Sequence, residues 1–309
     1  MSGGRFEGYR RGMPSVPFSQ VDVFAESACW GNPVAVVHLH ATRVDADAMS
    51  TEQMQLFARW TNLSETTFLL PPRDPEADYR LRIFTPGGEL PFAGHPTLGS
   101  ARAWLAAGGE PRNAGVVVQE CGAGLIRVRM DGDLLAFAAP TLVRSGEPDT
   151  QTLTAVVDAL GLAQNDVVAA SWVDNGPHWL GLLLRDAETV LSLRPDAAAI
   201  ASIGGVEVGV IGPYPVDTPG APADYEVRAF CPDLGVPEDP VTGSLNAGLA
   251  VWLIGVGLAP SAYLVSQGSV LERAGRVHIT REGEDIWVGG RAAVLVHGQV
   301  ELPQHGDGR

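Results

Sequence analysis

The chain reads Arg82-Ile83-Phe84-Thr85-Pro86 and, after a short loop, His95-Pro96-Thr97-Leu98-Gly99-Ser100. Further along, the same order returns as Arg228-Ala229-Phe230-Cys231-Pro232 and then Asp239-Pro240-Val241-Thr242-Gly243-Ser244. Each copy is typical of a strand, a loop and the start of a helix. The simplest explanation is that such units often carry Pro and a small residue at the helix start. Agreement at so many positions instead favours a duplicated half-fold, with two similar halves facing each other.

The helices that follow the two copies have small residues where they are expected to begin. These residues are Gly99, Ser100, Gly243 and Ser244. At a helix N-terminus the backbone N–H groups are free and the helix dipole is positive, which suits a carboxylate or another anion. A pseudo-twofold arrangement would aim both helix starts at one cleft between the halves, a common place for a small-molecule site.

His95 and Asp239 hold equivalent places in this alignment of the two copies. One of them could therefore face each side of a ligand. Taken alone, His95 could also be a loop residue with a structural hydrogen bond, and Asp239 before proline is a common turn residue. The repeat makes a functional role of both residues as well supported as these structural roles.

The rest of the chain is rich in short strand-like runs separated by Gly, Pro and Asp. Up to residue 140 we predict strands at residues 20–24, 33–38, 63–70, 79–84, 115–119, 125–130 and 134–138, and helices at 51–60 and 97–107. Beyond it we predict helices near 150–160 and 243–253, and strands at 167–172, 178–184, 206–211, 225–230, 263–266, 277–280 and 292–300. Many strands around few helices, without regular βαβ alternation, indicate an α+β fold rather than a doubly wound sheet.

All 21 basic residues of the 309-residue chain are arginines, because the sequence contains no lysine. The absence of lysine excludes a Schiff-base nucleophile and a Walker A loop, both of which need its amine. Arginine cannot replace it in proton transfer because it stays protonated at any working pH. No G-x-G-x-x-G stretch is present either, so a Rossmann-type nicotinamide or flavin enzyme is not indicated. Proton transfer must therefore use carboxylates, histidines, cysteines or tyrosines.

The formal net charge of −15 argues against nucleic acid or an anionic membrane as a partner, because both require basic patches. The longest apolar run, residues 249–260, is too short to span a bilayer. Residues 1–15 contain no apolar segment and predict a flexible extension rather than a signal peptide. The three cysteines lie far apart in the sequence, so they indicate neither a disulfide framework nor a zinc site. We expect a cytoplasmic protein.

The predicted strand over residues 63–70 carries Glu65 on the same face as aliphatic residues, because side chains alternate along a strand. A carboxyl in such surroundings loses its hydration, which raises its pKa towards neutrality. It could then take and give protons at physiological pH. The alternative is an edge-strand Glu65 that points into water.

Several stretches, in the same order along residues 17–300, resemble the PhzF family of phenazine biosynthesis, whose relatives include diaminopimelate epimerase. They are Asp22-Val23-Phe24, Gly31-Asn32-Pro33-Val34-Ala35-Val36-Val37, Asn62-Leu63-Ser64-Glu65-Thr66-Thr67-Phe68, Arg82-Ile83-Phe84-Thr85-Pro86, Phe92-Ala93-Gly94-His95-Pro96-Thr97-Leu98-Gly99, Glu238-Asp239-Pro240-Val241-Thr242-Gly243-Ser244, Gln267-Gly268 and Val288-Gly289-Gly290-Arg291. The resemblance implies two pseudo-symmetric domains, each a curled, mostly antiparallel sheet around a central helix. It also implies a homodimer without metal or organic cofactor.

The domains expected on this basis are a flexible extension (1–16), a first half with Glu65 and His95 (17–140), a second half with Asp239 and Ser244 (141–300) and a tail (301–309). The last strands of the second half could return to the first half.

The family's catalytic glutamate falls on Glu65, and its active-site histidine, aspartate and serine fall on His95, Asp239 and Ser244. In the phenazine enzyme these residues isomerise a dihydro-hydroxyanthranilate by moving a proton between ring carbons. The epimerase relatives use two cysteines, one on each side of the substrate. The matching loops of this chain, residues 90–100 and 236–246, contain no cysteine, which argues against a two-thiol epimerase.

The resulting hypothesis is a cofactor-independent isomerase of specialised-metabolite biosynthesis, acting on a small, anionic, unsaturated or cyclic carboxylic or amino acid. Glu65 would transfer the proton, while His95 and Asp239 orient and polarise the substrate. Two alternatives stay open. One is a cysteine-independent epimerase or racemase, and the other is a ligand-binding protein without turnover.

We expect backbone N–H groups rather than arginines to hold the substrate carboxylate, at Gly94 and Gly243 together with Ser244. Asn246 stands where the family more often has a small apolar residue, so it either contacts substrate or packs. Four further residues have no assigned role. Trp30, Trp60 and His178 are expected in the core or at the surface, and Cys231 is expected as a packed thiol.

Overall fold

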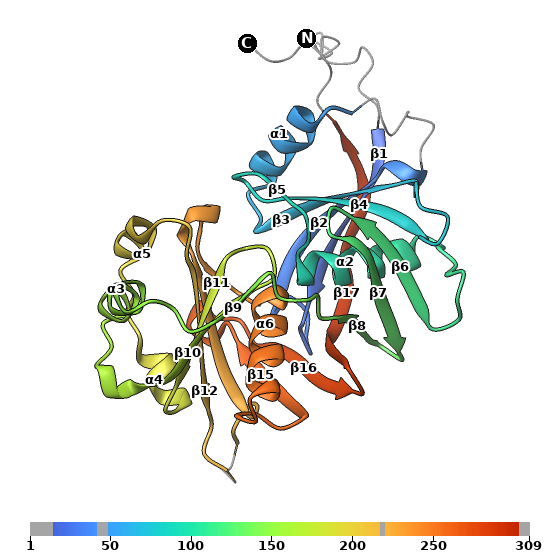
Figure 1. Cartoon of the computed structure of the whole chain (residues 1–309). Coiled ribbons are helices and arrows are strands. Elements are labelled where there is room, and N and C mark those ends of the chain that lie inside the picture. Colours follow the sequence, from blue (N-terminus) through green and yellow to red (C-terminus); the bar gives the residue numbers. More distant parts are fainter. Residues whose placement is uncertain (1–14, 42–48, 217–219, 303–309) are drawn as a thin grey trace, which may run out of the picture.

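The computed structural model describes residues 15–41, 49–216 and 220–302. The chain forms two lobes, in each of which a sheet curls around one central helix (Figure 1). Helix α2 (Gly94–Ala106) is central to the first lobe and helix α6 (Gly243–Gly255) to the second. The predicted α+β class and paired half-folds are confirmed. The predicted extension and tail lie largely outside the described residues, at 1–14 and 303–309.

The first lobe contains most of the N-terminal strands. They are β1 (Ser15–Val23), β2 (Asn32–His38), β3 (Glu65–Leu70), β4 (Tyr79–Phe84), β5 (Glu89–Leu90), β6 (Val116–Cys121), β7 (Gly124–Asp131) and β8 (Leu134–Ala138). Helix α1 (Thr51–Thr61) covers the outside of this sheet near β3 and β4. β1 includes two residues that the sequence analysis assigned to the extension, because Ser15 and Val16 pair with the end of β17.

The second lobe follows the same plan with more helices. Its strands are β9 (Arg144–Gly146), β10 (Val167–Asp174), β11 (Trp179–Leu184), β12 (Glu207–Pro213), β13 (Tyr225–Cys231), β14 (Val236–Asp239), β15 (Ala262–Gln267), β16 (Gly275–Glu282) and β17 (Asp285–Glu301). Besides α6, its helices are α3 (Thr150–Leu160), α4 (Ala187–Ser192) and α5 (Ala197–Ile203).

Strand β17 joins the two lobes. Its first part pairs with β16 and with β8, and its long second part pairs antiparallel with β1. In Figure 1 it runs as one long red arrow from the second lobe to the far end of the first. The end of the chain therefore completes the sheet around α2, and the two lobes share one strand.

The central helices α2 and α6 are buried, and small residues in each helix let the surrounding strands approach closely. A Cβ atom on Gly99 of α2 would lie 2.3 Å from Val34, and one on Gly248 of α6 would lie 2.3 Å from the carbonyl of Val173. Each of these glycines stands five residues after the first residue of its helix. When the two lobes are compared by structure, the first residue of α2, Gly94, therefore corresponds to the first residue of α6, Gly243.

This correspondence corrects the alignment of the two copies made from the sequence. With Gly94 matched to Gly243, His95 corresponds to Ser244, and not to Asp239. The sequence pattern misled because His95-Pro96 lies inside the first turn of α2, where proline is tolerated, whereas Asp239-Pro240 precedes α6.

The start of α2 is also corrected. The helix begins at Gly94, so Gly99 and Ser100 lie in its second turn, where their N–H groups are used within the helix. The Ser100 hydroxyl lies 2.9 Å from that of Thr67 in β3. Of the four small residues expected at helix starts, only Gly243 and Ser244 are found there.

Helices α4 and α5 were not predicted from the sequence because each is shorter than two turns. Each is capped by an aspartate, Asp186 or Asp196, whose side chain accepts a hydrogen bond from the third residue of the helix. With α3 they cover the outer face of the second-lobe sheet in a separate hydrophobic core. The inner face of that sheet is left to α6.

Candidate active site

The N-termini of α2 and α6 meet where the two lobes join. A Cβ atom on Gly94 would lie 2.7 Å from the Cα of Gly243, and one on Gly243 would lie 2.8 Å from the Cα of Gly94. Carbon atoms normally stay about 3.5–4.0 Å apart. Only glycine at both positions permits this contact, which brings the free N–H groups of two helix starts to one place.

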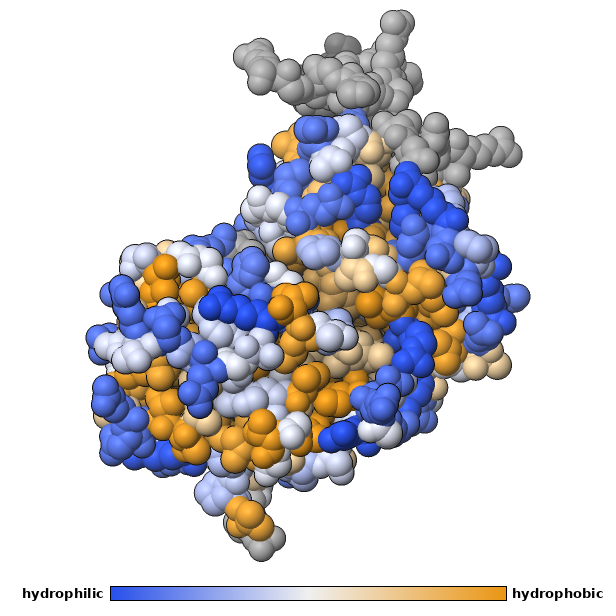
Figure 2. All heavy atoms as spheres, viewed as in Figure 1, coloured by the Kyte–Doolittle hydropathy of each residue, from blue (hydrophilic) through white to orange (hydrophobic). Residues whose placement is uncertain are grey.

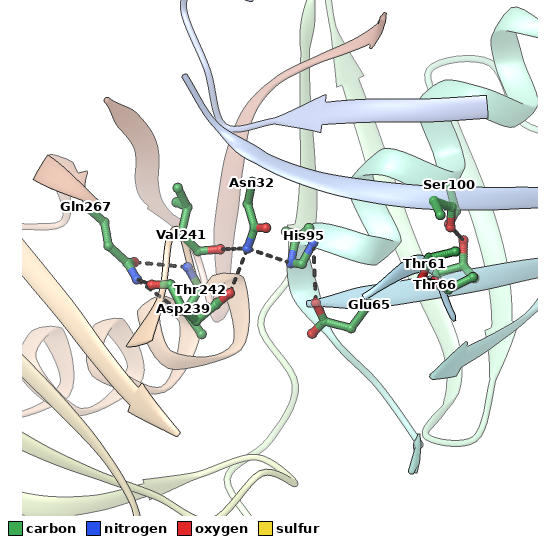
Figure 3. A network of polar contacts seen from close by, with 12 residues as sticks. Asn32, Thr61, Glu65, Thr66, His95, Ser100, Asp239, Val241, Thr242 and Gln267 are labelled. Carbon is green, nitrogen blue, oxygen red and sulfur yellow. Dashed lines mark hydrogen bonds and ion pairs between the residues drawn. The ribbon is translucent and has the colours of Figure 1, made fainter. Parts of the chain in front are cut away.

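Asn32, the first residue of β2, connects the polar residues of the two lobes (Figure 3). Its Nδ2 donates to Oδ1 of Asp239 at 2.9 Å and to the carbonyl of Val241 at 3.0 Å. The same nitrogen lies 3.3 Å from Nδ1 of His95. Asn32 is fully buried. It therefore fixes the position of His95 in the first lobe relative to Asp239 in the second.

Asp239 is oriented by a further set of hydrogen bonds inside the second lobe. The Thr242 hydroxyl donates to its Oδ2 at 2.6 Å, and Nε2 of Gln267 donates to its backbone carbonyl at 3.1 Å. Asn246 in turn donates to Oε1 of Gln267 at 2.9 Å and to the carbonyl of Thr242 at 2.8 Å. These contacts hold the carboxylate in one rotamer.

Glu65 begins β3 and turns its carboxyl towards His95 (Figure 3). Its Oε2 lies 3.5 Å from Nε2 of His95, and their side chains are 12% and 2% exposed. Neither of these two atoms has a hydrogen-bond partner among the described residues. Both are therefore available to a ligand that enters beside them.

Burial sets the protonation of these three groups. It raises the pKa of Glu65 well above its ordinary value, and the charge of Asp239 raises it further. It raises the pKa of Asp239 to about 6, although hydrogen bonds from Thr242, Asn32 and Ser64 oppose the shift. Burial lowers the pKa of His95 to about 3. The site thus holds a neutral imidazole and two carboxyls whose pKa values are raised by burial, a combination suited to proton transfer.

A small cavity of about 30 Å³ lies between the lobes beside these groups. The residues that line it are Ser64, Glu65, Thr85, Leu90, Ala93, Pro177, Trp179, Cys231, Val236, Asp239, Thr242 and Ser244. Nε1 of Trp179 donates to Oγ of Ser244 at 3.1 Å, which leaves the Ser244 hydroxyl hydrogen free for a ligand. No arginine is among these lining residues, so an anion here has helix-end N–H groups rather than guanidinium groups as donors.

Six of the seven predicted site residues converge on this place: Glu65, His95, Asp239, Gly94, Gly243 and Ser244. The seventh, Asn246, does not line the cavity and lies behind Thr242 in the hydrogen-bond network. Sequence reasoning gave no role to Asn32, Thr242 or Trp179. The position of Asn32 next to Pro33 in a resembling stretch was the available signal, but its partners are distant in the sequence.

The residues without an assigned role divide between surface and core. Trp30 and Trp60 are 49% and 75% exposed. The His178 side chain is 65% exposed, with Nδ1 3.1 Å from Oδ2 of Asp174. Cys231 is buried and also lines the small cavity.

A larger groove of about 1440 Å³ lies away from Glu65, His95 and Asp239, between α3, β10 and the C-terminal half of α6. Figure 2 shows apolar residues mixed with polar ones on this part of the second lobe. The groove contains no pair of acid and base like that at the small cavity, so its size does not make it the catalytic site.

The described residues contain neither a metal-binding cluster nor a membrane-spanning helix. Within residues 15–41, 49–216 and 220–302, no group of three or more His, Cys, Asp or Glu side chains is placed to hold a metal ion. In the same ranges, no helix is long and apolar enough to cross a membrane.

Comparison with known proteins gives the family. Residues 21–298 match PhzC-PhzF, the phenazine biosynthesis-like proteins. This chain belongs to that family. Antisense-enhancing sequence 1 of Schizosaccharomyces pombe is 36% identical over 92% of this chain and 95% of its own. The trans-2,3-dihydro-3-hydroxyanthranilate isomerase of Pseudomonas aeruginosa is 32% identical over 91% of this chain and 98% of its own. Other PhzF relatives are named isomerases, and this chain is an enzyme of that class.

Solved structures show the same fold. The PhzF-family protein of Enterococcus faecalis superposes with a TM-score of 0.74 at 27% identity, covering 94% of this chain and all of the other. A predicted epimerase from Pseudomonas aeruginosa gives a TM-score of 0.71 at 28% identity, covering 92% of this chain and 99% of its own. A hydroxyproline epimerase from Agrobacterium vitis, at 14% identity, shares the fold with a TM-score of 0.57 and covers 93% of this chain and 92% of its own.

Proposed function

We propose that this PhzF-family enzyme isomerises a small unsaturated or cyclic carboxylic acid by moving one proton, with Glu65 as the acid and base. One observation carries the proposal. The Glu65 Oε2 atom is buried, has no hydrogen-bond partner within the described part of the chain, and lies at a cavity that the N-termini of two helices approach. Burial raises the pKa of this carboxyl well above its ordinary value, which suits a group that must both take and return a proton.

In this mechanism the substrate carboxylate binds to the N–H groups of Gly94 and Gly243 and to the Ser244 hydroxyl. These donors stabilise the negative charge that spreads into the carboxylate as Glu65 removes a proton from the neighbouring conjugated carbon. His95, neutral because burial lowers its pKa to about 3, donates or accepts a hydrogen bond without adding charge. Glu65 then returns the proton, or one exchanged with solvent, to another carbon of the conjugated system.

The most specific support for a substrate comes from the isomerase of trans-2,3-dihydro-3-hydroxyanthranilate, which is 32% identical over nearly its whole length. We therefore propose that compound, or a cyclic amino acid like it, as the first candidate, and a role in specialised-metabolite biosynthesis. We also propose a cytoplasmic homodimer. Light scattering after size-exclusion chromatography tests the dimer.

A second candidate function is cysteine-independent epimerisation or racemisation of an amino acid. The fold shared with a predicted epimerase at 28% identity supports it. In that reaction one carbon is inverted and no double bond moves. Burial raises the pKa of the Cys231 thiol well above its ordinary value, so Cys231 is a poorer base than Glu65.

Proton NMR in D2O separates these functions. The protein is incubated with trans-2,3-dihydro-3-hydroxyanthranilate and with related unsaturated and cyclic amino acids. An isomerase gives a product with a shifted double bond, and an epimerase gives an inverted centre that carries deuterium. If ligands bind with no exchange and no product, the protein is a binding module and the proposal is wrong.

A further inference from the structure

A second buried carboxyl lies near the site, and the mechanism above does not use it. Glu207 begins β12 and is only 3% exposed. Its Oε2 atom has no hydrogen-bond partner among the described residues. A buried carboxyl oxygen without a donor destabilises the fold, so its presence requires an explanation.

Glu207 stands in the middle of a row that crosses three neighbouring strands. It pairs with Trp179 of β11 in the parallel register of β11 and β12. On its other side Val208 pairs with Phe230 of β13, so the antiparallel register continued by one residue places Glu207 opposite Cys231. Trp179 and Cys231 both line the small cavity. Since paired residues share one face of a sheet, Glu207 is directed to the same side.

This row stands at the N-terminus of α6. Trp179 donates to Ser244 in the first turn, whereas a Cβ atom on Gly209, one row further along β12, would meet Leu245. The pKa of the Cys231 thiol is raised by burial first and then by Asp239, Glu207 and Glu65. Three carboxyls therefore lie close enough to this thiol for their charges to act on it.

The small cavity must enlarge before a substrate can enter. Its volume of about 30 Å³ compares with about 300–1,000 Å³ for typical ligand sites. Glu207 does not line the cavity in this closed form, but both of its neighbours in the row do. Separation of the lobes would extend the cavity along that row and bring the unpartnered oxygen of Glu207 into the site.

We infer that Glu207 selects the substrate by accepting a hydrogen bond from its amino group, which makes that substrate a cyclic amino acid. The inference rests on the proposed function and deepens it. The carboxylate of such a zwitterion accepts hydrogen bonds from the N–H groups at the two helix N-termini. Its ammonium group lies against the acidic side chains of the second lobe. None of the residues that line the cavity is an arginine, so no guanidinium group competes for these carboxylates.

Binding of an amino acid at Glu207 should release a proton. Burial and the charge of Asp233 raise the pKa of Glu207 to about 8, so at neutral pH the carboxyl holds its proton. An ammonium group beside it favours the ionised form. Binding of the amino acid therefore releases a proton from Glu207, and binding of a plain carboxylic acid does not.

Calorimetric titration of the full chain tests the inference with two stable probes, 2-aminocyclohexanecarboxylate and cyclohexanecarboxylate. The variants are Glu207→Gln and, as a matched control, Glu226→Gln. Glu226 is also buried in the same lobe, and its Oε1 has no hydrogen-bond partner among the residues that the structure describes. Its Oε2 accepts a hydrogen bond from the Tyr214 hydroxyl, and its side chain alternates to the opposite face of β13 from Cys231.

We expect Glu207→Gln to weaken binding of the amino acid about 10- to 100-fold, the range of a charge-assisted hydrogen bond. Binding of cyclohexanecarboxylate should stay unchanged, and Glu226→Gln should alter neither. Titration in two buffers of different ionisation enthalpy should show proton release by the wild type with the amino acid and none by Glu207→Gln. If Glu207→Gln does not fold, Glu207→Met is used, which also removes the carboxyl and has the same expected loss of selectivity.

Three results would overturn the inference: no preference of the wild type for the amino acid, failure of the wild type to bind either probe, or an equal loss for both probes in the variant. The titration needs no turnover, so its outcome is separate from that of the proposed function. An enzyme that selects the amino acid through Glu207 but keeps full proton exchange in Glu65→Gln contradicts only the mechanism.

Discussion

Replacement of Gly243 by alanine tests the contact between the two helix starts. The added Cβ would lie 2.8 Å from the Cα of Gly94, and relief to an ordinary contact requires the helices to separate by about 0.7 Å. Backbone atoms cannot rotate away as a side chain can. Overpacking of this kind costs about 1–3 kcal/mol. In a chain of this size each kcal/mol lowers the melting temperature by roughly 2 °C, so a fall of about 2–6 °C is expected.

The effect on activity should exceed the effect on stability. A shift approaching 1 Å at a catalytic site can lower the rate about 100-fold. Circular dichroism during heating and the isomerisation rate are both measured, with Gly255→Ala as control. Gly255 ends the same helix, and a Cβ there meets nothing within 4 Å. If Gly243→Ala and Gly255→Ala have the same melting temperature and the same rate, the contact between the two helix starts does not have the proposed role.

Three further predictions concern protonation. Thr242→Val removes a donor to Asp239, so the pKa of Asp239 rises above about 6 and the acid limb of a pH–rate profile moves to higher pH by about one unit. The pKa of Glu207 is about 8 when folded and 4.5 in its ordinary state, so the folded protein loses stability as pH rises between them. Glu207→Gln removes that loss, and denaturant unfolding at pH 8.5 should show a gain of about 1–3 kcal/mol over wild type, whereas a loss would contradict it. Burial lowers the pKa of His38 to about 4, so the unfolded chain takes up a proton near pH 6.5 before the folded chain does. The free energy of unfolding should therefore fall as pH drops from 6.5 to 4, and it should fall less steeply in His38→Gln. If denaturant unfolding gives the same pH dependence for wild type and His38→Gln, His38 does not cause this loss.

Elements with strong local patterns could be predicted from the sequence. The strand Tyr79–Phe84 and the helix Thr150–Leu160 lie where alternation and capping place them. The short helices α4 and α5 could not be predicted, because a helix of less than two turns shows too little hydrophobic periodicity in the sequence. Their reason to exist is tertiary, since they cover an apolar face of the second-lobe sheet.

The site shows a similar division. Glu65, His95 and Asp239 could be named because each lies in a stretch that resembles the family. The correspondence between the two halves could not be derived, because Pro96 and Pro240 give similar patterns at different places relative to their helices. The role of Asn32 depends on a contact with Asp239 across the lobes, which no local pattern contains.

Solvent deuterium exchange in Glu65→Gln is the most direct test of the central claim. The change keeps the size of the side chain and removes the proton-transferring carboxyl. The account predicts that exchange at the reacting carbon of the substrate and turnover both fall by about 100- to 10,000-fold, while Glu226→Gln keeps wild-type rates. Wild-type exchange and turnover in Glu65→Gln would contradict the assignment of Glu65 as the acid and base.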